Sequence, residues 1–87
     1  MKAHNALVRD ALVSSIECIE SIVKQVESGE WPEWDELAAM TAGWRRHFID
    51  DAEGARVLKA SRLYEAMESA ISHAEAALRT HQQEPQQ

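Results

Sequence analysis

The sequence of 87 residues is poor in residues that interrupt helices and in residues that form covalent or metal links: it has one cysteine, two prolines and three glycines. A single cysteine, Cys18, excludes an internal disulfide and a thiolate-rich metal site, and it favours a reducing, cytoplasmic location. Arg9 and Asp10 interrupt the N-terminal apolar segment. The sequence therefore predicts neither a signal peptide nor a membrane span.

Basic residues are also scarce, since 9 Lys and Arg stand against 15 Asp and Glu, a net charge of −6 with neutral histidines. Because nucleic-acid binding draws its affinity from Lys and Arg, this balance argues against a nucleic-acid partner. The length allows one domain at most. A domain of this size buries only about 60–65% of its unfolded surface, so self-association would add stability that the core lacks.

The scarcity of helix breakers and the absence of an Asn-Gly or Asp-Gly turn predict an all-α fold. We expect three antiparallel amphipathic helices in an up-down bundle, over residues of about 3–28, 32–49 and 52–80. They should form a single domain over residues 1–80. The Gln-rich tail over 81–87 has no apolar residue to dock, and we expect it to be disordered.

Apolar residues of the first predicted helix recur at steps of three and four, as on one face of a helix. This set is Val8, Leu12, Ile16, Ile19, Val23 and Val26. A second set widens the stripe and comprises Leu7, Ala11, Cys18 and Ile22. At the edge of the stripe, Cys18 is interpreted as a small buried hydrophobe. Gly29 then marks the helix end.

The segment from Trp31 to Glu36 has the features of a helix start, with proline at the first position and carboxylates in the first turn. Heptad-spaced residues follow, namely Trp34, Leu37, Thr41, Trp44 and Phe48. Asp50 is predicted to cap the next helix, with Glu53 reaching back in a capping box. For Trp31, two interpretations stay open: a staple onto the core, or an anchor for a partner.

The third predicted helix has the most regular pattern, Val57, Ala60, Tyr64, Met67, Ile71, Ala74 and Leu78. A second stripe of mainly small residues, Leu63, Ala66, Ala70 and Ala77, predicts a second neighbouring helix. The first and third helices exceed the second in length, so their ends should leave apolar residues such as Ile71 and Ala74 only partly covered, which typically marks a partner site. The predicted partner-binding residues are Leu7, Val8, Trp31, Tyr64, Met67, Ile71 and Leu78.

The sequence offers little for catalysis or for cofactor binding. No two of its four histidines lie three or four residues apart, and the Glu-x-x-His pattern of helical di-iron sites is absent. His47 with Asp50 or Asp51 is the one weak metal candidate, although a histidine near a helix C-terminus also interacts favourably with the helix dipole. We expect no enzyme activity, no cofactor and no metal.

One enzyme alternative rests on architecture alone, because small helical chorismate mutases have about this length and three helices. Such enzymes need several Arg and Lys around a dicarboxylate substrate. Arg56, Lys59 and Arg62 line up at steps of three, and Arg45 and Arg46 lie on the preceding helix. We favour a surface patch that pairs with the acidic turn or with an acidic partner.

Glu33-Trp34-Asp35-Glu36-Leu37 opens the short second helix, and Trp44-Arg45-Arg46 follows it, between two long helices. This arrangement resembles the FliT-type flagellar export chaperones, in layout over residues 7–80 and in motif over 34–46. The resemblance implies a cytoplasmic chaperone that binds a hydrophobic helical segment of an export client, typically the filament cap protein, or an export-apparatus component. The resemblance is to a short member of the family, in which we expect no additional C-terminal helix of the kind that longer members have.

From the residues alone, two main interpretations of the apolar stripes stay open. In the first, they form a groove that captures an amphipathic client helix. In the second, another copy covers them, and the chain is a homodimeric structural or regulatory module without a client. A third interpretation is a transcription-linked interaction through the acidic turn of Asp50, Asp51 and Glu53. None of the three involves a membrane partner.

Overall fold

The computed structural model describes residues 2–31 and 33–83, with side chains described for 7–31 and 33–82. This part of the chain contains five helical segments. They are α1 (Lys2–Ser28), α2 (Trp34–Trp44), the π-helix η1 (Arg45–Asp50), α3 (Ala52–Ala60) and α4 (Tyr64–Gln83). No strand occurs in this part of the chain. The predicted all-α fold class is confirmed.

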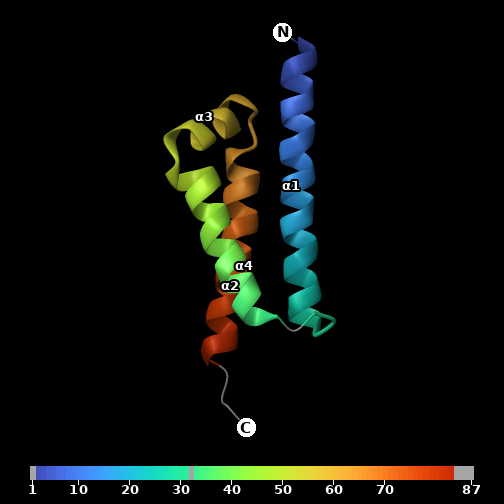
Figure 1. The fold of residues 1–87 in the computed structure, drawn as a ribbon, viewed down its shortest axis with the longest axis vertical. Coiled ribbons are helices and arrows are strands. Elements are labelled where there is room, and N and C mark those ends of the chain that lie inside the picture. The colour runs from blue at the N-terminus through green and yellow to red at the C-terminus, as the bar shows by residue number, and fades with distance from the viewer. Residues whose placement is uncertain (1, 32, 84–87) are drawn as a thin grey trace.

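The first helix, α1, matches its predicted range and ends where glycine permits it. Gly29 has a φ of 84°, the left-handed conformation that favours glycine just past a helix. The buried residues of α1 all belong to the predicted stripe and are Ile16, Ile19, Val23 and Val26. Its N-terminal turns extend past the other helices (Figure 1), and Leu7 is 69% exposed.

The second predicted helix, over 32–49, appears as α2 followed without a break by η1; Pro32 itself lies outside the described residues. Leu37 and Thr41 are buried, and the Thr41 hydroxyl donates to the Leu37 carbonyl oxygen at 2.6 Å. The wider winding of a π-helix shows at its end, where the Asp51 amide donates to the Arg46 carbonyl oxygen at 3.0 Å. Three aromatic residues are half-buried against the core: Trp34, Trp44 and Phe48.

The prediction of one continuous helix over 52–80 is wrong, because the chain turns between α3 and α4. The Arg62 amide donates to the Lys59 carbonyl oxygen at 3.1 Å. The Leu63 amide donates to the Leu58 carbonyl oxygen at 2.9 Å. These two bonds form a Schellman motif with Arg62 in the left-handed conformation at a φ of 62°. Leu58 and Leu63 are both buried, which supplies the apolar contact that accompanies this motif.

The cap of α3 lies one residue later than predicted. The Asp51 carboxylate, not that of Asp50, accepts a hydrogen bond from the Gly54 amide at 2.9 Å. Glu53 pairs with Arg56 at 3.1 Å instead of reaching back to the cap. The predicted capping box is therefore wrong, because the last turn of η1 includes Asp50.

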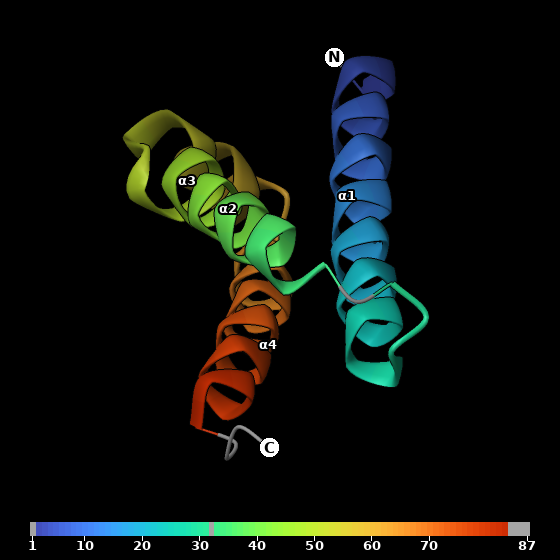
Figure 2. The ribbon, with the colours of Figure 1, turned by 60° about the horizontal axis from the view of Figure 1, so that its bottom comes forward.

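The central helix is α4, which contacts both α1 and the α2–η1 segment (Figure 2). In Figure 1, α1 and α4 run in one direction, α2 with η1 runs in the other, and α3 crosses beside the end of η1. The predicted three-helix bundle is not confirmed, because the turn after α3 divides the third predicted helix in two. The buried residues of α4 are Met67, Ala70, Ile71, Ala74 and Ala77. The predicted second neighbour of this helix is thus confirmed, although Ala66 of the second stripe is exposed.

The chain stays helical beyond residue 80, where the disordered tail was predicted to begin. The His81 ring stacks on Trp34 with centroids 4.0 Å apart, which ties the end of α4 to the start of α2. The helix continues to Gln83, so the prediction of disorder is wrong for residues 81–83. Residues 84–87 lie outside the described part.

Gly54 packs so closely on η1 that a Cβ atom there would overlap the His47 carbonyl oxygen. We expect Gly54→Ala to lower the free energy of unfolding by about 2 kcal/mol, because α3 or η1 must shift. In Gly43→Ala, the control, the new methyl meets nothing within 4 Å. This change should raise stability by about 0.5–1 kcal/mol, as alanine favours a helix interior. Urea unfolding followed by circular dichroism measures both, and equal effects would contradict the contact.

Candidate functional site

The predicted partner-binding residues do not form one surface. Met67 and Ile71 are both 0% exposed, because α1 and α2 pack on α4 from two sides. The expectation that Ile71 and Ala74 stay partly uncovered is therefore wrong. Leu7 is exposed, and the half-buried members are Val8, Trp31, Tyr64 and Leu78. Partner binding by these residues stays a prediction.

An open groove of about 520 Å³ runs between α1 and the α2–η1 segment. We call it the α1–α2 groove, and its lining residues are Ser15, Cys18, Ile19 and Ile22 of α1, Met40 and Trp44 of α2, and His47 and Phe48 of η1. Both walls pack on α4 more extensively than on each other. Figure 2 shows the resulting separation of α1 from α2.

The walls of the α1–α2 groove are apolar and carry no Asp, Glu, Lys or Arg. This is notable in a chain in which 28% of the residues are charged. Cys18 is exposed on the α1 wall, so its interpretation as a buried hydrophobe is wrong. An apolar concavity with a continuous uncharged lining is typical of a surface that binds a protein partner.

The sequence indicated one wall of this groove, the α1 wall. Cys18 and Ile22 belong to the second apolar set of the first predicted helix. Because this set lies beside a complete core stripe, it indicates an apolar face that is too wide for one neighbouring helix to cover. The α2 wall had no equivalent signal. Met40 is not one of the heptad-spaced apolar residues of the second predicted helix, to which Trp44 belongs. Only the packing of α2 on α4 shows which side of α2 stays open.

A charged cluster holds the α2–η1 wall on α4. The Arg45 Nε atom donates to Glu75 at 2.6 Å and its Nη2 atom donates to the other oxygen of the same carboxylate at 2.9 Å. Glu68 lies 3.5 Å from Nη2 and accepts a hydrogen bond from the Ser72 hydroxyl at 2.8 Å. The hydrogen bonds that Arg45 donates to Glu75 raise the pKa of Arg45 above its usual value. Arg45 therefore presents a positive charge to both carboxylates.

We expect Glu75→Gln to lower the free energy of unfolding by about 1 kcal/mol, because the bidentate pair is only about a third exposed. Glu17→Gln serves as the control, since Glu17 is exposed on α1 and has no ion-pair partner among the described residues. It should change stability by less than about 0.5 kcal/mol. Chemical unfolding at low and high salt tests the assignment, which fails if the two variants behave alike.

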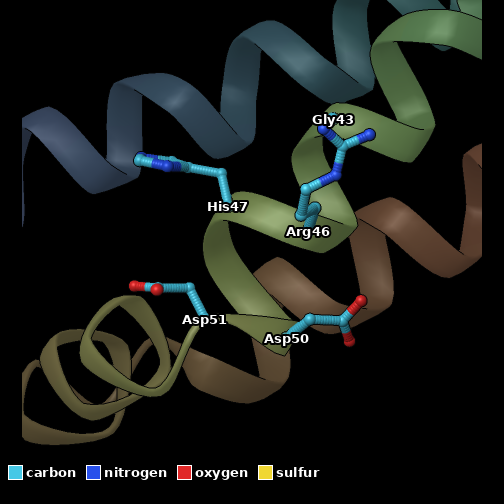
Figure 3. Close-up of a pocket in the computed structure, with 5 residues that line it drawn as sticks. All are labelled: Gly43, Arg46, His47, Asp50 and Asp51. Atoms are coloured by element: carbon cyan, nitrogen blue, oxygen red, sulfur yellow. The ribbon is translucent and has the colours of Figure 1, made fainter.

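A second hollow lies around η1 and is lined by Gly43, Arg46, His47, Asp50 and Asp51 (Figure 3). In Figure 3, His47 and Asp51 extend to one side of η1 and Asp50 to the other, so the charged groups do not converge. Among the described residues, no three His, Cys, Asp or Glu side chains are placed to hold a metal ion. The predicted pairing of His47 with either aspartate therefore has no third ligand in that part of the chain.

The basic residues of the enzyme alternative are dispersed. Arg56 pairs with Glu53, and the Lys59 Nζ atom lies 5.1 Å from the centroid of the Tyr64 ring. Arg62 falls in the turn after α3, so the spacing of three that suggested one helical row does not continue to it. The predicted pairing of Arg45 is made with α4 and not with the acidic turn.

No protein-family model, curated protein or solved structure matches this chain. The resemblance of residues 34–46 to FliT-type export chaperones therefore stays a hypothesis that rests on those residues. Within the described part of the chain, no helix combines the length and the hydropathy that crossing a bilayer requires.

Proposed function

We propose that this chain is a non-catalytic protein-binding module that captures an amphipathic helix of another protein in the α1–α2 groove. One observation carries the proposal: two helices present an uncharged, mainly apolar lining on facing walls of an open groove. Helix-in-groove recognition uses such a surface, into which a helix inserts apolar residues at spacings of three, four and seven.

The composition of the groove supports this mode of binding. Trp44 and Phe48 are half-buried aromatic residues, the type that most often dominates binding energy at interfaces. Met40 is flexible and polarisable, which allows one groove to fit different apolar side chains. The α1 wall has Ile22 at one end and the small side chains Ser15 and Cys18 toward the other, so a helix could approach α1 closely there.

An export client is the finer form of the proposal. The resemblance of residues 34–46 to FliT-type chaperones supports a helical segment of a secreted filament protein, of the filament cap type, as the occupant. An export-apparatus component is the other partner that this resemblance implies. In either case the groove would shield an apolar helix from water before secretion, and binding without any chemical step would be sufficient.

We expect Ile22→Ser and Met40→Ser each to weaken binding of an amphipathic helical peptide at least about tenfold, because each removes an apolar wall contact. The probe is a synthetic peptide of about 15 residues with leucines on one face, long enough to form a helix on binding. Calorimetry gives the dissociation constant. The reaction rate of Cys18 with a thiol reagent reports occupancy, since a bound helix would cover this exposed side chain.

Leu78→Ser is the matched control, because Leu78 is also half-buried but does not line the groove. It should leave peptide binding within about twofold of the unchanged chain. The opposite pattern, in which Leu78→Ser abolishes binding and the groove variants do not, would place binding at Leu78, one of the predicted partner-binding residues, and not in the groove. Ile71→Ser is unsuitable, since it would put a hydroxyl into the core.

A specific feature of α1 favours self-association as a second candidate. Four residues of α1 that are exposed or half-buried lie symmetrically along the helix. The midpoint between Leu7 and Ile22 falls between residues 14 and 15, and so does the midpoint between Ala11 and Cys18. Two α1 helices that pair antiparallel about this point would place Leu7 of each copy against Ile22 of the other. Such an interface is self-complementary, as a twofold dimer requires.

For this second candidate, we expect Ala11→Cys to give a disulfide-linked dimer through Cys18 of another copy. The unchanged chain should not link, because its two Cys18 residues would lie about 10 Å apart along the paired helices, beyond disulfide reach. Ala39→Cys is the control, as Ala39 is an exposed alanine of α2 that does not line the groove. Equal cross-linking of both variants on a non-reducing gel would contradict the antiparallel pairing.

A further inference from the structure

The α2 wall of the groove continues into acidic residues at one end. Glu33, Glu36, Met40, Trp44 and His47 recur at steps of three and four, so they follow one face of α2 and η1. The last three line the groove. Glu33 is the residue before α2, and Glu36 lies in its first turn. The apolar wall therefore ends in two carboxylates, next to the connection between α1 and α2.

Neither of these two carboxylates forms an ion pair among the described residues, unlike some other glutamates of the chain. Glu53 and Glu75, for example, form ion pairs with Arg56 and Arg45. Glu33 and Glu36 are exposed, and neither side chain forms an ion pair or hydrogen bond within the described residues. Carboxylates in a first turn also interact favourably with the helix dipole, but Asp35 shares that effect.

The rest of the groove has less negative charge of this kind. The α1 wall is uncharged. The opposite end, around η1, has the cation Arg46 as well as Asp50, and the Asp51 carboxylate there caps α3. The negative charge along the groove is therefore greater at the α2 N-terminal end. An occupant complementary to it is apolar along its length and positive at one end.

We infer that the partner is an amphipathic helix with Lys or Arg at one end, seated with that end beside Glu33 and Glu36. This inference rests on the proposed function, since it specifies the occupant of the same groove. The apolar contacts hold the helix, and the two carboxylates select its charge and fix its direction. Ion pairs at an exposed rim add modest affinity and act mainly on specificity and association rate.

The test uses three synthetic peptides with the same leucine face that differ only in carrying Lys, Gln or Glu at one end. We expect the Lys peptide to bind about fivefold more tightly than the Gln peptide at low salt, and the Glu peptide to bind most weakly. The preference should shrink in high salt, because exposed charges are screened. Calorimetry with the full chain measures all three dissociation constants.

Glu36→Gln and Asp35→Asn form a matched pair, since both remove one negative charge from an exposed residue in the first turn of α2. Only Glu36 lies on the face that leads into the groove. Glu36→Gln should reduce the Lys preference from about fivefold to about twofold, and Asp35→Asn should leave it unchanged. Circular dichroism confirms that both variants retain their helix content.

The outcomes separate this inference from the proposed function. Equal binding of the three peptides, with loss of binding in Ile22→Ser, would overturn the basic partner and keep the groove. Equal effects of Glu36→Gln and Asp35→Asn would mean that net charge alone attracts the peptide, which also overturns it. Failure of every peptide to bind would overturn the proposed function. Sedimentation showing a dimer that Ile22→Ser dissociates would replace the foreign helix by a second copy.

Discussion

The packing of α4 against two helices at once is the constraint on which the other features depend. Met67 and Ile71 have no exposed surface, and the alanines beside them allow neighbouring helices to come close. Because α1 and α2 both bury their apolar faces on α4, they have little apolar surface left for each other. The α1–α2 groove follows from this arrangement.

The helices themselves could be predicted, because apolar spacing of three and four is a local property of the sequence. The break between α3 and α4 could not. Val57, Ala60 and Tyr64 keep that spacing although the chain turns between Ala60 and Tyr64, so the pattern gives no sign of the break. Such a turn is usually marked by glycine at its left-handed position, and here Arg62 occupies it. Tertiary burial of Leu58 and Leu63 stabilises a conformation that local propensity disfavours.

The candidate site was less predictable than the fold, because it depends on which faces meet. The predicted partner site was derived from the helix lengths, which assumes that each helix covers its neighbour evenly. Ile71 was expected to be partly uncovered and is fully buried, because α4 lies between two other helices. The bond between Arg45 and Glu75 joins residues 30 positions apart, so no local pattern indicates it. The exposed Leu7 was predictable, since it depends only on the excess length of α1.

The groove stays open in a single chain for an energetic reason. To close it, α1, with its buried side chains such as Ile19 and Val23, would have to move away from α4, on which it packs more extensively than on α2. Each fully buried side chain of this kind contributes about 1.5–3 kcal/mol, so the exchange would lose more apolar burial than it gains. The α2 wall is fixed independently by Arg45 and by the close contact of Gly54 with η1. A helix that enters therefore meets two walls already in place, and binding requires little rearrangement of the core.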